Sequence, residues 1–183
     1  EAELTDFGVR FCKIRSLGAE KKYLRVGNFV MPNLALIPGP LDGKDGCLVN
    51  WHVPIDDTHH WKYMIYFSRV GPIDEKGIRA RDQAELGSDY GAVRAKANRY
   101  LQNRESMKSE SYSGMGFWFP AHDLFATQGA GPIQDRTKER LAPSDVVVVA
   151  SRKALLAGIK RTQEGQDPLH VLRKPDANLF GHL

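Results

Sequence analysis

The stretch CLVNWHVPIDDTHHWKYMIYF, residues 47–67, contains two apolar runs separated by a short polar break. Residues 47–53 and 60–67 are long enough for strands and rich in aromatic and β-branched side chains. Residues 54–58, PIDDT, combine a proline with turn-forming polar residues and interrupt the apolar pattern. The stretch therefore predicts two strands, of which 60–67 has the stronger pattern.

The residues before this stretch carry the same kind of pattern. Apolar residues alternate with smaller or polar ones at 7–11, a second apolar run covers 23–31, and a third, 33–37, lies between two prolines. Residues 39–46, GPLDGKDG, are dense in turn-forming residues, so we expect 33–37 and 47–53 to be hairpin partners. Short strands joined by such turns favour an antiparallel sheet.

The second half of the chain predicts loops and helices. Residues 70–113 are polar and interrupted by glycines, with weak helical character only at 92–103, and they predict a long covering loop. A short helix is expected over 121–128, where Gly129 ends it, and another from a cap at Asp135 to Leu141.

The strongest helix pattern runs over 145–161, with Ser144 and Asp145 as candidate N-caps. We expect the apolar face of this helix to pack against the sheet, which predicts an α+β fold. Beyond Gly165, two prolines predict an irregular arm. The predicted packing face consists of Val148, Leu155 and Ile159.

The composition excludes several classes of protein. Of 183 residues, 42% are hydrophobic and 26% charged, which is typical of a folded domain and not of a disordered chain. The formal net charge of +4 is scattered, so we predict no nucleic-acid partner, while an anionic small substrate is compatible with it. The longest apolar run, 146–150, is far below the roughly 20 residues of a membrane span, so no membrane partner is expected. Cys12 and Cys47 are too few for a disulfide framework, which indicates a reducing cytoplasm.

Asp123 is the first candidate for chemistry. It lies between the aromatic residues of 117–119 and the apolar pair Leu124 and Phe125, where an ionised carboxylate is costly unless it is paired, capping or metal-bound. The alternative is that it caps its helix or stays solvated at the helix start. The six histidines include no His-x-His or His-x-x-x-His pair, so the residues alone predict no complete metal site.

Arg10 and Arg15 interrupt an apolar strand pattern. A guanidinium that points into a cavity suits a carboxylate ligand, because its planar fork matches both oxygens. The alternative is an outward face, and alternation alone does not decide between the two faces. The sequence contains no phosphate-binding loop, dinucleotide fingerprint or nucleophile elbow.

Three segments together resemble one family of enzymes. They are FGVRF with the following IR at 7–15, VNWHVPIDDTHHW at 49–61, and HDLFATQGAGPIQDRTKERL at 122–141 followed by Ser144 and Asp145. They resemble the catalytic domain of Rieske non-haem iron oxygenases, in the branch of phthalate 4,5-dioxygenase, chlorobenzoate dioxygenase and dehydrodivanillate O-demethylase. The resemblance covers most of the chain and is thinnest at 70–109 and in the tail.

This resemblance implies a helix-grip fold (START/Bet v1-like), in which a curved antiparallel sheet packs on a long C-terminal helix. It implies mononuclear Fe(II) held by two histidines and one carboxylate, with open positions for dioxygen. The carboxylate ahead of the Q-G run falls on Asp123, which is thereby the predicted catalytic and metal-binding residue. The resemblance also implies substrate-binding roles for Arg10, Asn50 and His52 toward an aromatic carboxylate.

Further cofactors and partners follow from the same resemblance. Electrons from NAD(P)H pass through a separate reductase component to a Rieske [2Fe-2S] cluster and then to the iron. The reaction is ring hydroxylation or O-demethylation, and the subunits form a homotrimer.

The chain departs from the family in one respect. It carries neither the Cys/His pairs that bind a Rieske cluster nor the two closely spaced histidines that hold iron. We therefore expect residues 1–183 to be the C-terminal portion of the catalytic domain, with the Rieske domain and the first part of the catalytic domain absent, and to be inactive alone. The alternative hypothesis is a non-catalytic helix-grip domain that binds a hydrophobic ligand between sheet and helix.

Overall fold

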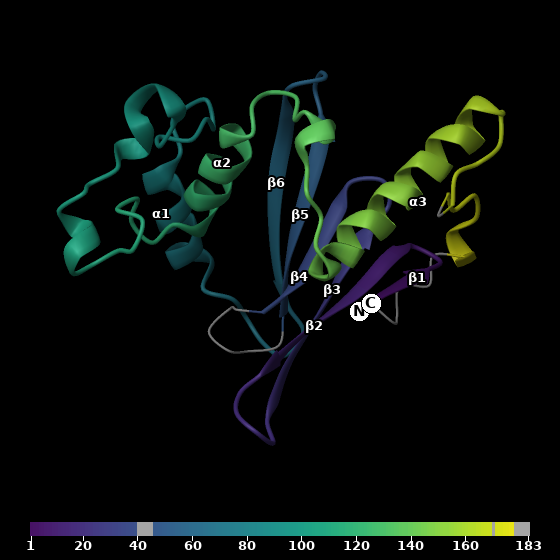
Figure 1. Ribbon diagram of the computed structural model, residues 1–183, viewed down its shortest axis with the longest axis horizontal. Helices are drawn as coiled ribbons and strands as arrows, with labels where there is room; N and C mark the ends of the chain where they lie inside the picture. Colours follow the sequence, from purple (N-terminus) through teal and green to yellow (C-terminus); the bar gives the residue numbers. More distant parts are fainter. Residues whose placement is uncertain (40–45, 170, 178–183) are drawn as a thin grey trace. The chain divides into compact units, whose positions relative to one another are not determined.

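Six antiparallel strands form one sheet in the order of the sequence (Figure 1). The computed structural model describes residues 1–39, 46–169 and 171–177. Each strand pairs with the one before it, so the sheet is a meander, and the predicted hairpin between β4 and β5 is confirmed. The strands are β1 (Ala2–Thr5), β2 (Gly8–Ser16), β3 (Lys22–Val30), β4 (Leu34–Pro38), β5 (Gly46–Pro54) and β6 (His60–Ser68).

Close packing of the main chain governs the start of β2. Gly8 has a φ of 149°, and a Cβ at this position would lie 2.1 Å from the carbonyl oxygen of Phe29 on β3. Only glycine fits there without displacing the strand. Of the predicted turn at 39–46, residues 40–45 lie outside the described part of the chain.

The chain divides into two compact units. We refer to residues 1–73 and 139–183 as the sheet unit and to residues 74–138 as the helical unit. The sheet unit contains all six strands and the long helix α3, whereas the helical unit contains α1 and α2.

Helix α3 (Val146–Gln163) packs against β1 and β2, as Figure 1 shows. Its buried residues are Ala154 and Gly158, which lie four apart and therefore on one side of the helix. A Cβ on Gly158 would come within 3.3 Å of the Met31 side chain. Small side chains thus let the helix approach the sheet unit closely, and the α+β helix-grip architecture is confirmed.

The packing face predicted for this helix is wrong, and its predicted N-cap is confirmed in position only. Val148 and Ile159 are exposed and Leu155 is only half-buried, because the small residues form the packing face. Asp145 is the N-cap residue, as expected, but its side chain makes no capping hydrogen bond to the helix. Its carboxylate instead accepts a hydrogen bond from the main-chain N–H of Ala142 at 2.8 Å.

The helical unit contains α1 (Glu75–Glu85) and α2 (Phe119–Gly129). Helix α2 confirms the predicted short helix. Helix α1 contradicts the continuous loop predicted over 70–113. Its N-terminus is capped by Asp74, whose carboxylate accepts the N–H of Gly77 at 3.0 Å.

Two further segments contain only short turns, one where the sequence showed weak helical character within a predicted loop and one where a short helix was expected. Residues 92–103 contain a 3₁₀ turn at Lys96–Leu101, and the segment after Asp135 contains one at Arg136–Lys138. In both places a polar side chain bonds to nearby main chain, which competes with helix formation. The Asp135 carboxylate, for example, accepts the N–H of Thr137 at 3.0 Å.

The described part of the tail is irregular, as expected. Arg161 donates to the carbonyl oxygen of Asp167 at 2.7 Å, and Arg173 pairs with the Asp167 carboxylate. No helix within residues 1–39, 46–169 and 171–177 is long and apolar enough to cross a membrane.

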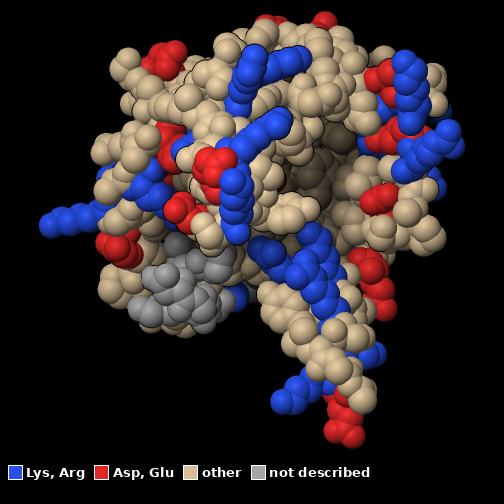
Figure 2. Space-filling view, turned by 60° about the vertical axis from the view of Figure 1, so that its left-hand side comes forward, with Lys and Arg blue, Asp and Glu red and all other residues tan. Residues whose placement is uncertain are grey.

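Charged side chains of both signs stand beside one another on the face drawn in Figure 2. Several ion pairs between described residues are exposed, such as Arg79 with Glu75, and an exposed pair contributes at most about 1 kcal/mol. Two pairs are largely shielded from solvent and contribute more. They are Arg94 with Glu85 and Arg152 with Glu139.

Candidate functional site

Asp123 lies in the second turn of α2, and its carboxylate is exposed. The N-cap of the helix is Trp118, so Asp123 does not cap it. The neighbouring aromatic side chains do not bury it, because Phe117 is 84% exposed and Phe119 and Phe125 are also exposed. Among the described residues, the Asp123 carboxylate has no hydrogen bond or ion pair, and it is available to a ligand.

The N-terminal end of α2 is anchored by three side chains. The indole Nε1 of Trp118 donates to the Asp82 carboxylate on α1 at 3.1 Å. The ring Nε2 of His122 donates to the carbonyl oxygen of Gly116 at 3.1 Å. Ala121, in the first turn of the helix, is fully buried. The histidine next to Asp123 therefore has a structural partner.

The described residues do not form a complete iron site. Within residues 1–39, 46–169 and 171–177, no three His, Cys, Asp or Glu side chains lie close enough together to hold a metal ion. A carboxylate is a ligand that non-haem Fe(II) accepts beside two imidazoles. The exposed, unbonded carboxylate of Asp123 fits one of three such ligands, and no two further ligand side chains of the described residues lie close enough to complete the set.

The strand register places the predicted substrate-binding residues on both faces of the sheet. Residues paired across adjacent strands point the same way, whereas neighbours along one strand point opposite ways. Arg10 and Asn50 belong to neighbouring rows of residues paired across the strands, so their side chains emerge from opposite faces. The row with Arg10 continues through Asn28, Leu36, Val49 and Ile65, and the row with Asn50 contains Val9, Phe29, Ala35 and Met64.

Arg10 is half-buried on its face of the sheet. Its guanidinium lies 3.6 Å from the Glu3 carboxylate on β1 and 5.7 Å from the centre of the Phe7 ring. Arg15, the other arginine considered, lies on the opposite face, in the exposed outer part of β2. The structure thus separates the two candidates for carboxylate binding.

Asn28 shares the Arg10 face, and the sequence analysis missed it. It is directly opposite Arg10 in the register and only 7% exposed, and its Oδ1 has no hydrogen-bond partner among the described residues. An unpaired buried amide oxygen is costly, which makes it a candidate ligand contact. The available signal was a polar residue inside the apolar run 23–31.

Asn50 and His52 share the other face, because they are two apart on β5. Asn50 is 5% exposed, and its Oδ1 also has no hydrogen-bond partner within the described part of the chain. The Nδ1 of His52 lies 3.0 Å from the Nε2 of His60 on β6, a pairing eight residues apart that the sequence analysis missed. Burial, and then the positive charges of His60 and Lys62, lower the pKa of His52.

This division limits what the predicted residues can do together. A ligand on one face of the sheet can contact Arg10 and Asn28, or Asn50 and His52, but not all four. The substrate-binding roles of Arg10, Asn50 and His52 stay predictions.

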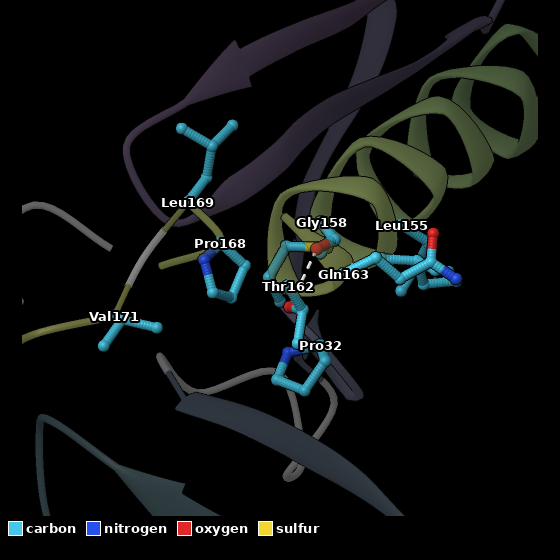
Figure 3. A pocket seen from close by; sticks show the side chains of 10 residues that line it. Pro32, Leu155, Gly158, Thr162, Gln163, Pro168, Leu169 and Val171 are labelled. Atoms are coloured by element: carbon cyan, nitrogen blue, oxygen red, sulfur yellow. Dashed lines mark hydrogen bonds between the residues drawn. The ribbon is translucent and has the colours of Figure 1, made fainter. Parts of the chain in front are cut away.

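An apolar cavity of about 480 Å³ lies beside the end of α3 (Figure 3). It is bounded by the β3–β4 turn at Pro32, by Leu155 and Ile159 of α3, and by Leu169 in the tail. Among the described residues, no charged side chain lines it, and none of the predicted site residues does. The cavity is suited to an uncharged apolar group, because a carboxylate would find no cation there.

The motif runs quoted for the family resemblance contain two turns of the same design. In one, the Asp56 carboxylate accepts the N–H of Thr58 at 2.7 Å and its hydroxyl at 3.0 Å. In the other, Asp135 accepts the N–H of Thr137 at 3.0 Å and its hydroxyl at 2.6 Å. These bonds lower the pKa of Asp56 to about 2 and also lower that of Asp135. Both aspartates therefore serve as turn formers.

A forked ion pair follows the second of these turns. The Nη1 and Nη2 atoms of Arg152 on α3 both donate to the Glu139 carboxylate, which raises the pKa of Arg152. The pair ties the end of the motif run to the long helix.

Comparison with known proteins places these features in a family. Residues 1–179 match the family model described as "LigXa C-terminal domain like". The phthalate 4,5-dioxygenase oxygenase subunit of Pseudomonas putida is 32% identical over 177 residues, covering 92% of this chain and 39% of that protein.

Two further relatives are similar over shorter stretches. The 5,5'-dehydrodivanillate O-demethylase oxygenase subunit of Sphingobium sp. is 34% identical over 132 residues, 70% of this chain and 26% of that protein. The 3-chlorobenzoate-3,4-dioxygenase oxygenase subunit of Comamonas testosteroni is 28% identical over 160 residues, 75% of this chain and 35% of that protein. The chain thus spans between about a quarter and two-fifths of the length of these relatives.

Proposed function

The chain belongs to the LigXa C-terminal domain-like family, and from this premise we propose that it is the C-terminal part of the catalytic domain of a Rieske non-haem iron oxygenase. The observation that carries the proposal is the family match over residues 1–179, which includes α2 with Asp123. The motif-based resemblance is confirmed by the same match and by the named relatives.

The proposed reaction inserts oxygen into an aromatic carboxylate, by ring hydroxylation or by O-demethylation. Two of the relatives are named for carboxylate substrates, phthalate and 3-chlorobenzoate, and one for an O-demethylation. The intact enzyme would be a cytoplasmic homotrimer served by a reductase component that draws electrons from NAD(P)H. A [2Fe-2S] Rieske cluster outside this chain would pass the electrons on.

Asp123 is the contribution of this chain to the metal centre. The mononuclear iron would supply the activation of dioxygen. The Asp123 carboxylate would add one negative charge and a third ligand to two imidazoles, which fixes the metal more firmly than neutral ligands alone. The aromatic side chains around it are exposed here and would exclude water from such a centre once covered.

The substrate contacts of this chain divide between the two faces of the sheet. On one face, Arg10 can bind a carboxylate and Asn28 offers an unsatisfied amide beside it. On the other, the lowered pKa of His52 keeps its imidazole neutral near pH 7, so it can orient a ligand by hydrogen bonding. We assign recognition of the anionic group to the Arg10 face.

The cavity beside α3 favours a second candidate function, a helix-grip domain that binds a hydrophobic ligand without catalysis. The two functions predict different ligand chemistry. An oxygenase of this kind consumes dioxygen in the presence of an aromatic carboxylate, whereas the binding domain takes up neutral apolar molecules and consumes none.

The proposal is tested with Asp123→Ala in the intact subunit, beside the exposed Asp57→Ala as a matched control. We expect the first variant to lose iron and aromatic-dependent oxygen consumption and the second to retain both. Circular dichroism spectra should show that both variants are folded. Full iron content with normal turnover in Asp123→Ala would remove the assignment.

A further inference from the structure

Three consecutive residues of the helical unit have left-handed backbone conformation. The φ angles of Arg99, Tyr100 and Leu101 are 54°, 55° and 49°, and none of the three is glycine. This conformation is unfavourable for any residue with a Cβ, because the Cβ crowds the following carbonyl oxygen. It persists where surrounding contacts fix it, and such segments cluster where geometry serves function.

The Arg94 side chain holds this turn through hydrogen bonds to its main chain. Its Nη1 donates to the carbonyl oxygens of Tyr100 at 3.2 Å and of Leu101 at 3.4 Å. Its Nε donates to the Glu85 carboxylate at the end of α1 at 3.0 Å. Both side chains of this ion pair are largely shielded from solvent, so the guanidinium is held firmly.

The left-handed turn directs Tyr100 into the helical unit, against α2. The Tyr100 side chain is only 7% exposed. Its hydroxyl donates to Oε1 of Gln128 at 2.7 Å, and its ring meets the Phe125 ring edge-on at 5.1 Å. Tyr100 therefore holds the C-terminal half of α2 by one hydrogen bond and one aromatic contact.

The side of α2 that Tyr100 holds is opposite to Asp123. At 100° per residue, Phe125 is 200° and Gln128 is 140° around the helix axis from Asp123. Ala121 is the only buried residue of the described helix, so few apolar contacts fix its rotation. A change in the Tyr100 contact would thus turn the Asp123 carboxylate.

We propose that Tyr100 is a positioning residue that fixes the rotation of α2 and thereby the direction of the Asp123 carboxylate. The proposal deepens the proposed function and rests on it for the role of Asp123. It explains why an unfavourable left-handed turn is kept: the turn places one buried phenol behind the helix that carries the predicted ligand.

The test uses the intact subunit with Tyr100→Phe, Gln128→Met and the double variant, and Tyr112→Phe as control, since Tyr112 is 98% exposed. Tyr100→Phe keeps the ring and loses only the hydrogen bond. We expect α2 amides to exchange hydrogen about fivefold faster in either single variant, the double variant to equal the singles, and the control to be unchanged. The ligand-field spectrum of the ferrous ion should shift, and kcat should fall several-fold with little change in KM.

Unchanged α2 exchange in Tyr100→Phe, or an unshifted iron spectrum despite faster exchange, would overturn the positioning role. Failure of the proposed function is separately visible. In that case Asp123→Ala would leave iron bound, and the exchange rates would still show whether Tyr100 holds the helix.

Discussion

The sheet unit and the helical unit are built by different means. In the sheet unit, alternating apolar residues pair across hairpins, and α3 packs through small side chains such as Ala154 and Gly158. In the helical unit, α1 has no buried residue, and single polar contacts join its parts, such as Arg94 with Glu85 and Trp118 with Asp82. The first arrangement distributes stability over many contacts, whereas the second concentrates it in a few side chains.

The largest expected effect is in the sheet unit, at Gly8. Gly8→Ala would put a Cβ 2.1 Å from the Phe29 carbonyl oxygen, at a φ that only glycine adopts without strain. We expect a loss of about 3 kcal/mol or more in the free energy of unfolding. Urea denaturation would measure it, with Gly71→Ala as control because its Cβ would meet open space. Equal stability of both variants would show that β2 and β3 do not approach as closely as described.

The next largest effect is expected in the helical unit, at Arg94. Arg94→Met removes the contacts to Glu85 and to the left-handed turn and leaves a shielded carboxylate unpaired. We expect the free energy of unfolding of the helical unit to fall by about 2–3 kcal/mol. In hydrogen exchange, faster exchange should be confined to residues 74–138. As a control, Arg79→Met removes the exposed ion pair with Glu75 and should lower the free energy of unfolding by less than about 0.5 kcal/mol. A loss spread evenly over both units would contradict the comparison.

Glycine and alanine substitutions at one exposed leucine in each unit compare the backbone conformations of the two units. Leu156 is in the interior of α3 and Leu101 in the left-handed turn, and both are exposed. At Leu156 the Gly variant should be about 1 kcal/mol less stable than the Ala variant. At Leu101 the order should reverse, with Gly about 1 kcal/mol more stable than Ala. Thermal denaturation of the four variants checks the sign, and the same order at both positions would contradict the left-handed assignment.

The smallest effect concerns pH and the histidine pair of the sheet unit. The pKa of His52 is lowered in the folded state, so the unfolded chain binds this proton more readily. The free energy of unfolding should therefore fall as the pH drops below about 6.5, the ordinary pKa of histidine. Urea denaturation at pH 7.5 and 5.5 measures this fall, and His60→Ala should reduce it by removing a neighbouring positive charge. An unaltered pH dependence in that variant would mean that burial alone lowers the pKa.

The same contrast explains which elements could be predicted from the sequence. Strand alternation is a local signal, so β2 to β6 and the β4–β5 hairpin were predicted, whereas the short β1 was not. Helix α1 was missed because its sequence, EKGIRARDQAE, has no apolar stripe and the helix buries none of its residues. The packing face of α3 was predicted on large residues, although close approach to the sheet selects small ones.

The candidate site was predictable only in part. Motif resemblance pointed to Asp123, Arg10, Asn50 and His52, but the face on which each side chain lies depends on the strand register. The register also brings His60 beside His52 and Asn28 beside Arg10. Such neighbours come from different strands, and no spacing along the sequence identifies them.

The central claim is that Asp123 supplies the carboxylate ligand of a mononuclear iron centre. The most direct measurement is anomalous diffraction at the iron absorption edge from crystals of the intact subunit. The account predicts an anomalous peak within bonding distance of an Asp123 carboxylate oxygen, with two imidazole nitrogens completing the set. A mononuclear iron peak whose ligands do not include Asp123 would contradict it.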